Sequence, residues 1–237
     1  MQPGLLPNVL VDCVVFGFDL TDLKVFLIER NFTNEGIIYT DLKLPGDLIR
    51  ANEDPLDAAR RILKEKTGLG NIYMKQFMSF GSPDRLKRKE RDLEWLRQID
   101  YPEKDIITIA YYALIDMSEQ GGVTLNLNAD VRCCQVNEVN DLVMDHMEIL
   151  NSALEHLRID LLLQPLAFEL LPEKFTLSQM QKLYEVILGK TFDKRNFRKK
   201  FANMNYLVPL YQKQVGVAHS PAMLYIFSRE EYNKTNA

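Results

Sequence analysis

The sequence predicts an α+β fold in two parts, and three observations lead to that expectation. Two runs of β-branched and aromatic residues, 11–18 and 23–30, are separated by DLTD, which favours a β-hairpin. Residues 55–66 place apolar side chains at the spacing of a helix that buries one face. Residues 176–227 hold two helical patterns followed by two strand-like runs. This order indicates a mixed N-terminal part and a separate C-terminal part.

Length and composition indicate an ordinary globular protein. The chain has 237 residues, of which 46% are hydrophobic, enough for one large core or two modest ones. No run approaches the roughly 20 apolar residues that a membrane-spanning helix requires, and the N-terminus lacks the pattern of a signal peptide. The three cysteines, Cys13, Cys133 and Cys134, lack zinc-ligand spacing. We expect a cytoplasmic protein with reduced thiols, no membrane association, and neither a metal nor a cofactor.

The net charge of −4 is distributed unevenly along the chain. Residues 190–200 contain six cations and one anion, so this segment carries +5 and the rest of the chain carries −9. A positive cluster in an acidic protein is typical of a nucleic-acid contact, although most charge clusters are only solvated faces. The place of the cluster in the fold therefore decides between the two interpretations.

The first predicted helix is marked at both ends. Asp54 is placed to cap its N-terminus, Pro55 occupies the first helical position, and Gly68 ends it. A further strand is expected at residues 108–116, followed by a loop and a strand-like run at residues 123–128. These elements complete the N-terminal α/β part.

Two charged segments are expected to be helical. Residues 83–100 mix cations and anions with few apolar residues, which favours a solvated helical insertion over a binding site. Residues 144–163 repeat apolar residues at helical spacing and end before Pro165. This second pattern favours a long amphipathic helix that connects two domains.

The C-terminal part begins with a clearly delimited helix. Thr176 and Gln179 form a capping-box pattern, and Gly189 follows the last apolar position. A short turn leads to Asp193, which is placed to cap a second helix. The apolar residues of this second helix form one narrow stripe: Phe197, Phe201 and Met204.

Two strand-like runs, residues 206–211 and 222–227, follow the second helix. Helix, short turn, basic helix and hairpin are the elements of a winged helix-turn-helix, in which the second helix enters the major groove of DNA. The positive cluster lies on that second helix. Its place in the fold therefore favours DNA binding over a merely solvated surface.

The face of the basic helix opposite Phe197 is predicted to contact DNA. At 100° per residue, Arg195 and Lys199 point outward and Asn196 flanks them. Arginine and asparagine can bond base edges, and lysine supplies phosphate contacts, so we expect these three residues to read bases. The remaining predicted DNA contacts are Lys190, Lys194, Arg198 and Lys200 near the helix and Lys213 and His219 in the hairpin.

Residues 46–69 resemble a Nudix box, whose pattern is G-x5-E-x7-R-E-U-x-E-E-x-G-U with U apolar. Aligning Gly68 with the final glycine places Glu53 and Arg61 at the matching glutamate and arginine, whereas Asp47 stands at the first glycine. The sequence LPGD is also similar to the family's usual LPGG. This resemblance covers roughly residues 9–140 and implies the Nudix α/β/α sandwich.

The resemblance fails at the metal ligands. In working Nudix enzymes the box glutamates collect magnesium, but here Ile62 and Lys66 replace two of them. Repulsion between Mg²⁺ and an ammonium about 5 Å away, at an effective dielectric constant near 20, is on the order of 6 kcal/mol. We therefore expect no catalytic residues and no hydrolysis. The alternative is a divergent hydrolase that recruits carboxylates elsewhere, such as Glu90 or Glu94.

Over roughly residues 11–227 the chain is similar to the Nudix-related transcriptional regulators. The phrases DHMEILNSALEHLR, PLAFELLPEKFTL and DKRNFRKK occur in the same order as in that family. The resemblance implies a dimeric repressor that binds a palindromic operator and is released by a small effector. It divides the chain into a Nudix-like effector-sensing domain at 1–142, a linker helix at 143–165 and a winged helix-turn-helix domain at 166–237.

Within that family one branch responds to ADP-ribose or related NAD metabolites, and another, in Bacteroides-type bacteria, responds to sugars such as L-arabinose. The long insertion after Arg85 departs from the short loop of the ADP-ribose branch. Chiefly from the resemblance to the sugar-responsive branch, we expect a pentose, with an ADP-ribose-like nucleotide as the alternative. A diphosphate would need cations, and Lys43, Lys66 and Arg85 are available. The candidate effector residues are Lys43, Asp47, Glu65, Lys66, Asp145 and His146. Capping or interdomain contact is an equally good role for the last two.

Overall fold

The computed structural model describes residues 5–34, 36–83, 85, 92, 106–118, 127–214 and 221–235. These residues form two compact units. The larger unit contains most of the chain up to residue 157, and the second contains residue 158 onward together with short segments near residues 20 and 117. Each unit has its own sheet and its own buried core.

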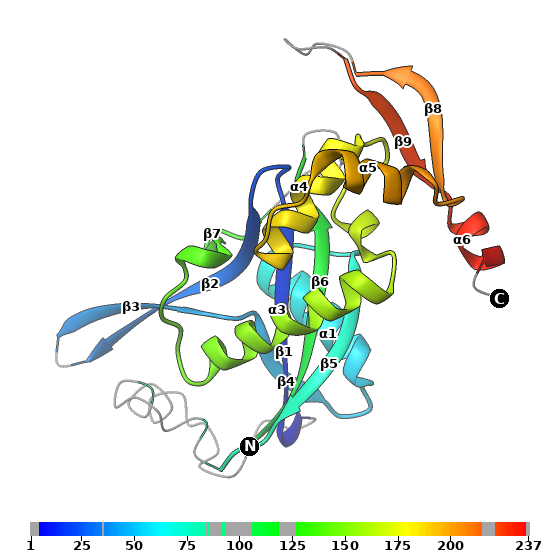
Figure 1. Ribbon diagram of the computed structural model, residues 1–237. Helices are drawn as coiled ribbons and strands as arrows, with labels where there is room; N and C mark the ends of the chain where they lie inside the picture. The colour runs from blue at the N-terminus through cyan, green and yellow to red at the C-terminus, as the bar shows by residue number, and fades with distance from the viewer. Residues whose placement is uncertain are drawn as a thin grey trace. The chain divides into compact units, whose positions relative to one another are not determined.

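The larger unit is built on a seven-stranded sheet with strand order β3-β2-β1-β6-β5, in which β4 also pairs with the first half of β1 and β7 with β2 (Figure 1). The strand bounds are Leu5–Phe18 for β1, Leu23–Asn34 for β2, Ile37–Lys43 for β3, Gly46–Arg50 for β4, Tyr73–Phe80 for β5, Ile107–Asp116 for β6 and Val131–Gln135 for β7. Residues 11–18 are all buried at the centre of the sheet, which explains why this stretch is almost entirely apolar.

Helix α1 (Pro55–Thr67) has the ends that the sequence predicts. The Asp54 side chain accepts a hydrogen bond from the backbone N–H of Leu56, and Gly68 ends the helix in the left-handed conformation with φ of 82°. The buried face of the helix consists of Ala58, Ala59, Ile62, Leu63 and Thr67. This face packs on the sheet, where the thiol of Cys13 lies 3.9 Å from the carbonyl oxygen of Ala59.

Helix α3 (His146–Leu163) lies across the other face of the sheet (Figure 1). Two contacts of its first half fix it there: the His146 ring accepts a hydrogen bond from the backbone N–H of Leu44, and the His156 ring lies 5.2 Å from that of Phe77. A short 3₁₀ turn, η1 (Val136–Glu138), precedes it. The sheet therefore lies between helices, which confirms the predicted α/β/α sandwich.

The second unit contains a helix-turn-helix followed by a hairpin, as predicted. Its elements are η2 (Leu166–Glu169), α4 (Leu177–Leu188), α5 (Lys194–Ala202), β8 (Leu207–Lys213), β9 (Met223–Phe227) and α6 (Arg229–Thr235). The capping box of Thr176 and Gln179 is complete, and Gly189 and Asp193 occupy the predicted cap positions. The last third of α3, from Arg158 onward, also belongs to this unit.

Aromatic rings form the core of the second unit. Tyr184 of α4 packs edge-on against Phe197 and Phe201 of α5, with ring centroids 5.7 and 5.2 Å apart. Phe227 of β9 stacks on Phe168 at 4.0 Å and joins the hairpin to the same unit. Because the two α5 phenylalanines are the buried residues of that helix, its remaining side chains face solvent.

Some sequence expectations need correction. Met204 lies beyond the end of α5 and is only partly buried, so the helix stripe consists of the two phenylalanines. Of residues 83–100, only Pro83, Arg85 and Asp92 are among the described residues. Both of these charged side chains are buried, so the expectation of a purely solvated insertion is wrong for these two residues. Most of the strand-like run at 123–128 also lies outside the described residues.

Strands β3, β4, β5 and β7 and helix α6 were not expected from the sequence. Among the described residues, no helix combines the length and the apolar composition needed to cross a membrane.

Candidate functional sites

The box loop and the box helix are joined by one arginine. Arg61 donates two hydrogen bonds to the carboxylate of Glu53, at 2.6 and 2.8 Å, and a third to the carbonyl oxygen of Leu48 at 3.1 Å. The bond from Arg61 lowers the pKa of Glu53. This carboxylate is therefore an anion held by a cation, and its role is to fix the loop before α1.

None of the box residues Ile62, Glu65 and Lys66 presents a free carboxylate. Ile62 is fully buried in the core beneath the helix. Glu65 lies between two guanidinium groups, those of Arg61 and Arg50, each at 3.2 Å. Lys66 forms an ion pair with Asp47 at 2.8 Å.

Magnesium does not fit these residues. Mg²⁺ needs several oxygen ligands in octahedral geometry, and this face offers one carboxylate that two arginines already neutralise, beside an ammonium group. Within the described part of the chain, no three or more His, Cys, Asp or Glu side chains are grouped to hold a metal ion. At these box positions Asp47 and Lys66 form a partly exposed ion pair with each other.

Lys43, Asp47 and Lys66 form a small cluster on the box side of the sheet, which we call the lysine cluster. Partial burial raises the pKa of Asp47, but bonds from Lys66 and from the Leu48 N–H outweigh it and hold the pKa below its ordinary value. Burial lowers the pKa of Lys43, and the carboxylate of Asp12 opposes this shift. Two ammonium groups thus flank one carboxylate, and both Lys66 and Asp47 remain partly open to solvent.

A buried polar junction connects the N-terminus of α3 to the sheet. Arg85 donates to both carboxylate oxygens of Asp145, at 2.7 and 3.0 Å, and to the hydroxyl of Thr108 at 2.5 Å. The carboxylate of Asp12 lies 3.9 Å from the same guanidinium. Burial raises the pKa of Asp12, and Arg85 offsets this only in part. Arg85 is therefore committed to the core, which argues against the sequence-based suggestion that it meets a diphosphate.

His146 completes this junction as a neutral ring. Its Nδ1 accepts the N–H of Leu44 at 2.9 Å, so the proton belongs on Nε2, which lies 3.9 Å from Asp12. Burial and the nearby Lys43 cation lower the pKa of His146 to about 3. A side chain at Gly46 would collide with the Asp12 carboxylate, so this position of the box leader admits only glycine. The positions of Asp145 and His146 favour the structural role over effector binding.

Acid should destabilise the larger unit through His146. Between about pH 6.5 and its folded pKa, the unfolded chain binds a proton that the folded chain excludes, so the free energy of unfolding falls as pH decreases, by about 1.4 kcal/mol per pH unit. In His146→Asn the amide oxygen can replace Nδ1 as acceptor, and this dependence should disappear. Urea unfolding from about pH 7 to about pH 5 measures both slopes.

The wild type and the variant share the other charged groups around residue 146: Asp12, Asp145, Lys43, Arg85 and Arg30. Asp12 acts in the opposite direction, because protonation of a carboxyl with a raised pKa stabilises the fold at low pH. The difference between the two proteins therefore isolates the imidazole. Equal pH slopes would show that folding leaves the pKa of His146 unchanged, which contradicts a ring held neutral by burial.

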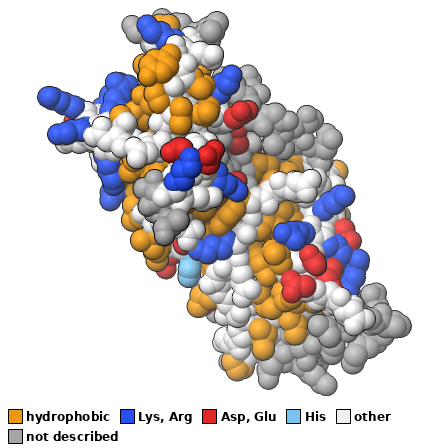
Figure 2. All heavy atoms as spheres, turned by 90° about the vertical axis from the view of Figure 1, so that its right-hand side faces the viewer, with side chains coloured by type: hydrophobic (Ala, Val, Ile, Leu, Met, Phe, Trp, Pro, Cys, Tyr) orange, Lys and Arg blue, Asp and Glu red, His pale blue; other side chains and the backbone are white. Residues whose placement is uncertain are grey.

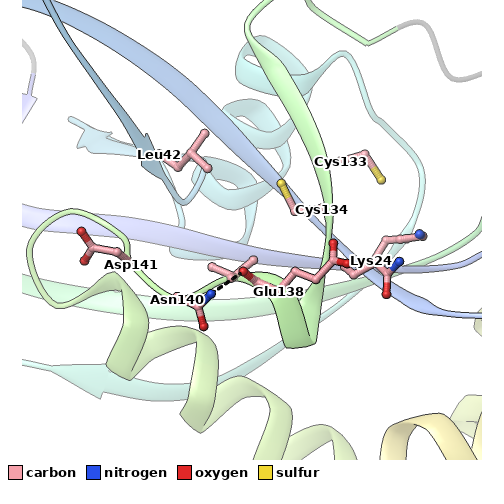
Figure 3. Close-up of a pocket in the computed structure, with 9 residues that line it drawn as sticks. Lys24, Leu42, Cys133, Cys134, Glu138, Asn140 and Asp141 are labelled. Atoms are coloured by element: carbon pink, nitrogen blue, oxygen red, sulfur yellow. Dashed lines mark hydrogen bonds between the residues drawn. The ribbon is translucent and has the colours of Figure 1, made fainter.

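A hollow of about 540 Å³ lies beside β7, away from the box residues (Figure 3). Cys133 and Cys134 point to opposite sides of the strand there, and Asn140 donates to the carbonyl oxygen of Glu138 at 3.0 Å. All three cysteines of the chain are free thiols. The charged lining residues are Lys24, Glu138 and Asp141, a net negative set that repels a diphosphate. None of the predicted effector residues lines this hollow.

Helix α5 presents its cations to solvent. Its predicted DNA contacts are all exposed: Lys194, Arg195, Asn196, Arg198, Lys199 and Lys200. Figure 2 shows lysine and arginine side chains gathered on one side of the upper part of the molecule. None of these cations forms a salt bridge with a carboxylate that the structure describes. The helix therefore presents a rigid positive face without internal neutralisation.

The turn before α5 is fixed by hydrogen bonds that were not expected from the sequence. The carboxylate of Glu185 accepts the N–H of Phe192 at 2.9 Å, which lowers the pKa of Glu185, and Gln181 donates to the Phe192 carbonyl. Arg198 donates to the Ser178 hydroxyl at 3.3 Å. These contacts fix the orientation of α5 against α4. A glutamate four residues before the terminal glycine was the only sequence signal for them.

The hairpin contributes one described basic residue. Lys213 is exposed at the end of β8, while Lys190 in the turn before α5 lies 5.2 Å from the centre of the Phe192 ring. His219, the other predicted contact, lies outside the described residues.

The N-terminal and C-terminal parts of the chain match two different protein families. Residues 7–150 match the family described as NUDIX domain, and residues 167–227 match the family described as NrtR DNA-binding winged helix domain. The chain is 27% identical over 230 residues to the ADPR responsive transcriptional repressor NtrR of Acinetobacter baylyi. That alignment covers 96% of this chain and 84% of the relative.

Solved structures share the full-length architecture. The crystal structure of Shewanella oneidensis NrtR is 26% identical, with a TM-score of 0.67, and covers 93% of this chain and 94% of that one. Its complex with a 27mer DNA gives 24% identity, a TM-score of 0.68 and coverage of 95% and 96%. A MutT/nudix family protein from Enterococcus faecalis gives 21% identity and a TM-score of 0.65, covering 96% of this chain and 89% of that one. Both units therefore have precedents in one chain.

Proposed function

Because this chain belongs to the Nudix family and ends in an NrtR-type winged helix, we propose that it is a transcriptional repressor that a nucleotide effector releases from its operator. In this proposal the winged helix unit binds a palindromic DNA operator in the cytoplasm. An ADP-ribose-like effector binds the Nudix unit beside the lysine cluster. The Nudix unit acts as a sensor and carries out no catalysis.

The observation that carries the proposal is the positive face of α5. A helix-turn-helix places its second helix in the major groove, and here that helix buries only Phe197 and Phe201 while all its cations face outward. Its contacts with α4 orient it before DNA arrives. A solvated helix in an acidic protein needs no such excess of positive charge, whereas a phosphate backbone does.

An ADP-ribose-like effector is supported better than a sugar. The Acinetobacter relative is described as ADPR responsive, and the expected pentose effector, L-arabinose, finds no support in the comparisons. Lys66 and Lys43 also supply two cations where a diphosphate needs them. Without magnesium ligands, a diphosphate held beside the lysine cluster is not cleaved, which argues against the divergent hydrolase.

The test measures DNA binding and its reversal. Fluorescence anisotropy with a duplex selected by the wild-type chain from a random-sequence pool should show binding that weakens steeply with salt. ADP-ribose should release the duplex, and L-arabinose should leave it bound. AMP should not accumulate with ADP-ribose and Mg²⁺. Tight binding reversed by L-arabinose alone would contradict the proposed effector, and rapid AMP formation would contradict the sensor.

We further propose that the chain binds the palindrome as a dimer, and an exposed arm of the Nudix unit supports this. Beyond residue 30, β2 and β3 form a two-stranded arm that extends from the sheet (Figure 1), and residues 36–40 are all exposed. Ile38 is 71% exposed on β3, the edge strand of the described sheet. A lone hairpin is marginally stable in water, and an apolar edge strand pairs readily with another strand. Two copies related by a two-fold axis can pair these edges antiparallel, and each half of a palindrome then receives one α5.

Ile38→Asp should convert the dimer to a 27.5 kDa monomer and weaken operator binding by at least tenfold, because a charge on the paired edge must lose its water. Sedimentation equilibrium gives the mass, and the anisotropy assay gives the affinity.

Ile107→Asp is the matched control, since Ile107 is 50% exposed on β6 of the same unit and lies off the arm. Helix α3 also exposes apolar side chains, among them Leu162. If Ile38→Asp stays a dimer and Leu162→Asp becomes a monomer, the interface lies on α3 and not on the arm.

A further inference from the structure

Tyr211 of the hairpin has a conformation that the fold alone does not explain. Its side chain is 86% exposed, and its φ of 54° lies in the left-handed region. Bulky residues avoid that region because Cβ crowds the backbone, whereas glycine and asparagine enter it readily. Tyr211 therefore has two unfavourable features: a strained backbone and an aromatic ring exposed to water.

The distortion lies in a bulge of β8. The pairs Pro209↔Tyr225 and Lys213↔Met223 are four residues apart on β8 but only two apart on β9, so β8 carries two extra residues. Bulges redirect side chains and are common at functional sites. Here the bulge turns Tyr211, Gln212 and Lys213 outward together, and all three are exposed.

Among the described residues, Tyr211 takes no part in the aromatic packing of this region. The other aromatic residues of this region form one cluster, in which Tyr206 meets Phe227 at 5.9 Å and Tyr232 at 5.4 Å. The Tyr211 side chain has no hydrogen bond or ring contact with any residue that the structure describes. Apolar side chains open to solvent are visible on the hairpin at the top of Figure 2.

We propose that Tyr211 is a DNA contact of the wing, packing its ring on a deoxyribose and donating its hydroxyl to a phosphate oxygen. Tyrosine is a common donor to DNA phosphates, and the adjacent Lys213 supplies the charge that attracts the same strand. The strained backbone leaves the ring exposed to solvent, where an external partner can cover it. This inference rests on the proposed DNA-binding function and assigns it a residue outside the basic helix.

The test uses Tyr211→Gly, which removes the ring and also relieves the backbone. The temperature of unfolding should stay equal or rise, because glycine accepts this φ without strain. Affinity for the selected duplex should nevertheless fall about tenfold. Tyr211→Phe loses only the hydroxyl, so its affinity for the duplex should lie between those of the wild type and Tyr211→Gly.

Salt dependence separates a direct contact from a displaced wing. The tyrosine is neutral, so Tyr211→Gly should keep the wild-type slope of log K against log salt, while Lys213→Ala should reduce it by about 0.9. Met223→Ala, which truncates an exposed apolar side chain on the facing strand, is the control and should bind as the wild type does.

Wild-type affinity in Tyr211→Gly would overturn the inference. So would a loss of affinity accompanied by a reduced slope, because that pattern means that the wing and Lys213 have moved. If the wild-type chain selects no duplex at all, the proposed function fails along with it. If the wild type binds through α5 and the Tyr211 variants match it, only the present inference fails.

Discussion

Replacing Arg195 and Lys199 together by alanine should lower operator affinity by about 10²- to 10³-fold. A bidentate arginine contact with a base contributes about 1–3 kcal/mol, and the lysine adds a phosphate contact. Both side chains are exposed on α5 and neither contributes to its buried face, so the variant should fold with unchanged stability. Anisotropy titrations between about 50 and 200 mM salt would also show a slope reduced by about 0.9 for each phosphate that the variant no longer neutralises.

The matched control is Lys174→Ala with Lys182→Ala. These two cations are also exposed in the winged helix unit, but they lie outside α5, so the variant loses the same charge. If both double variants weaken binding equally, net charge rather than the α5 face determines affinity. If neither changes it, α5 is a solvated helix and the proposed function is wrong.

Asp47 and Lys66 should shift effector affinity in opposite directions. A diphosphate competes with the Asp47 carboxylate for the ammonium of Lys66, since the two groups now form a 2.8 Å ion pair. Lys66→Gln should weaken ADP-ribose binding about tenfold or more, because hydrogen bonds to charged groups contribute about 1.5–3 kcal/mol. Asp47→Asn should strengthen it by a similar factor by removing the competing anion. Isothermal titration calorimetry on the full chain measures both.

Lys64→Gln is the control for this pair, because Lys64 is an exposed lysine on the same helix, two residues away. A neutral pentose makes no ion pair with Lys66, so calorimetry with L-arabinose should give no dependence on charge at residue 47. Weaker binding in both Lys66→Gln and Asp47→Asn would mean that the ion pair shapes the cleft and does not compete with the ligand. That outcome would leave DNA binding by α5 untouched.

Local signals predicted most of the helices and their ends. Asp54, Thr176, Gly189 and Asp193 cap the helices that the sequence assigned to them, because a cap depends on residues within one turn. The strands β3, β4, β5 and β7 were not recognised. Their residues are partly exposed or polar, and they become strands through pairing with distant segments.

The candidate site was predictable only in its outline. The alignment with the Nudix box indicated that Ile62 and Lys66 cannot hold magnesium, and the structure adds that Lys66 pairs with Asp47. The alignment could not indicate that Arg85 binds Asp145, sixty residues away. Nothing in the sequence of a charged segment shows which of its side chains will be buried. The same limit applies to Tyr211, whose backbone strain depends on the register between two strands.

The sequence by itself determined the order of the elements, the helix caps, the loss of the metal ligands and the outward cations of α5. Each of these depends on chemistry or spacing within a few residues. Only the tertiary structure decided which charges became internal: it buried Asp12, Arg85, Asp145 and neutral His146 together beneath α3. Burying a charge is costly unless a partner meets it, and that partner comes from the packing of strands and helices far apart in the chain.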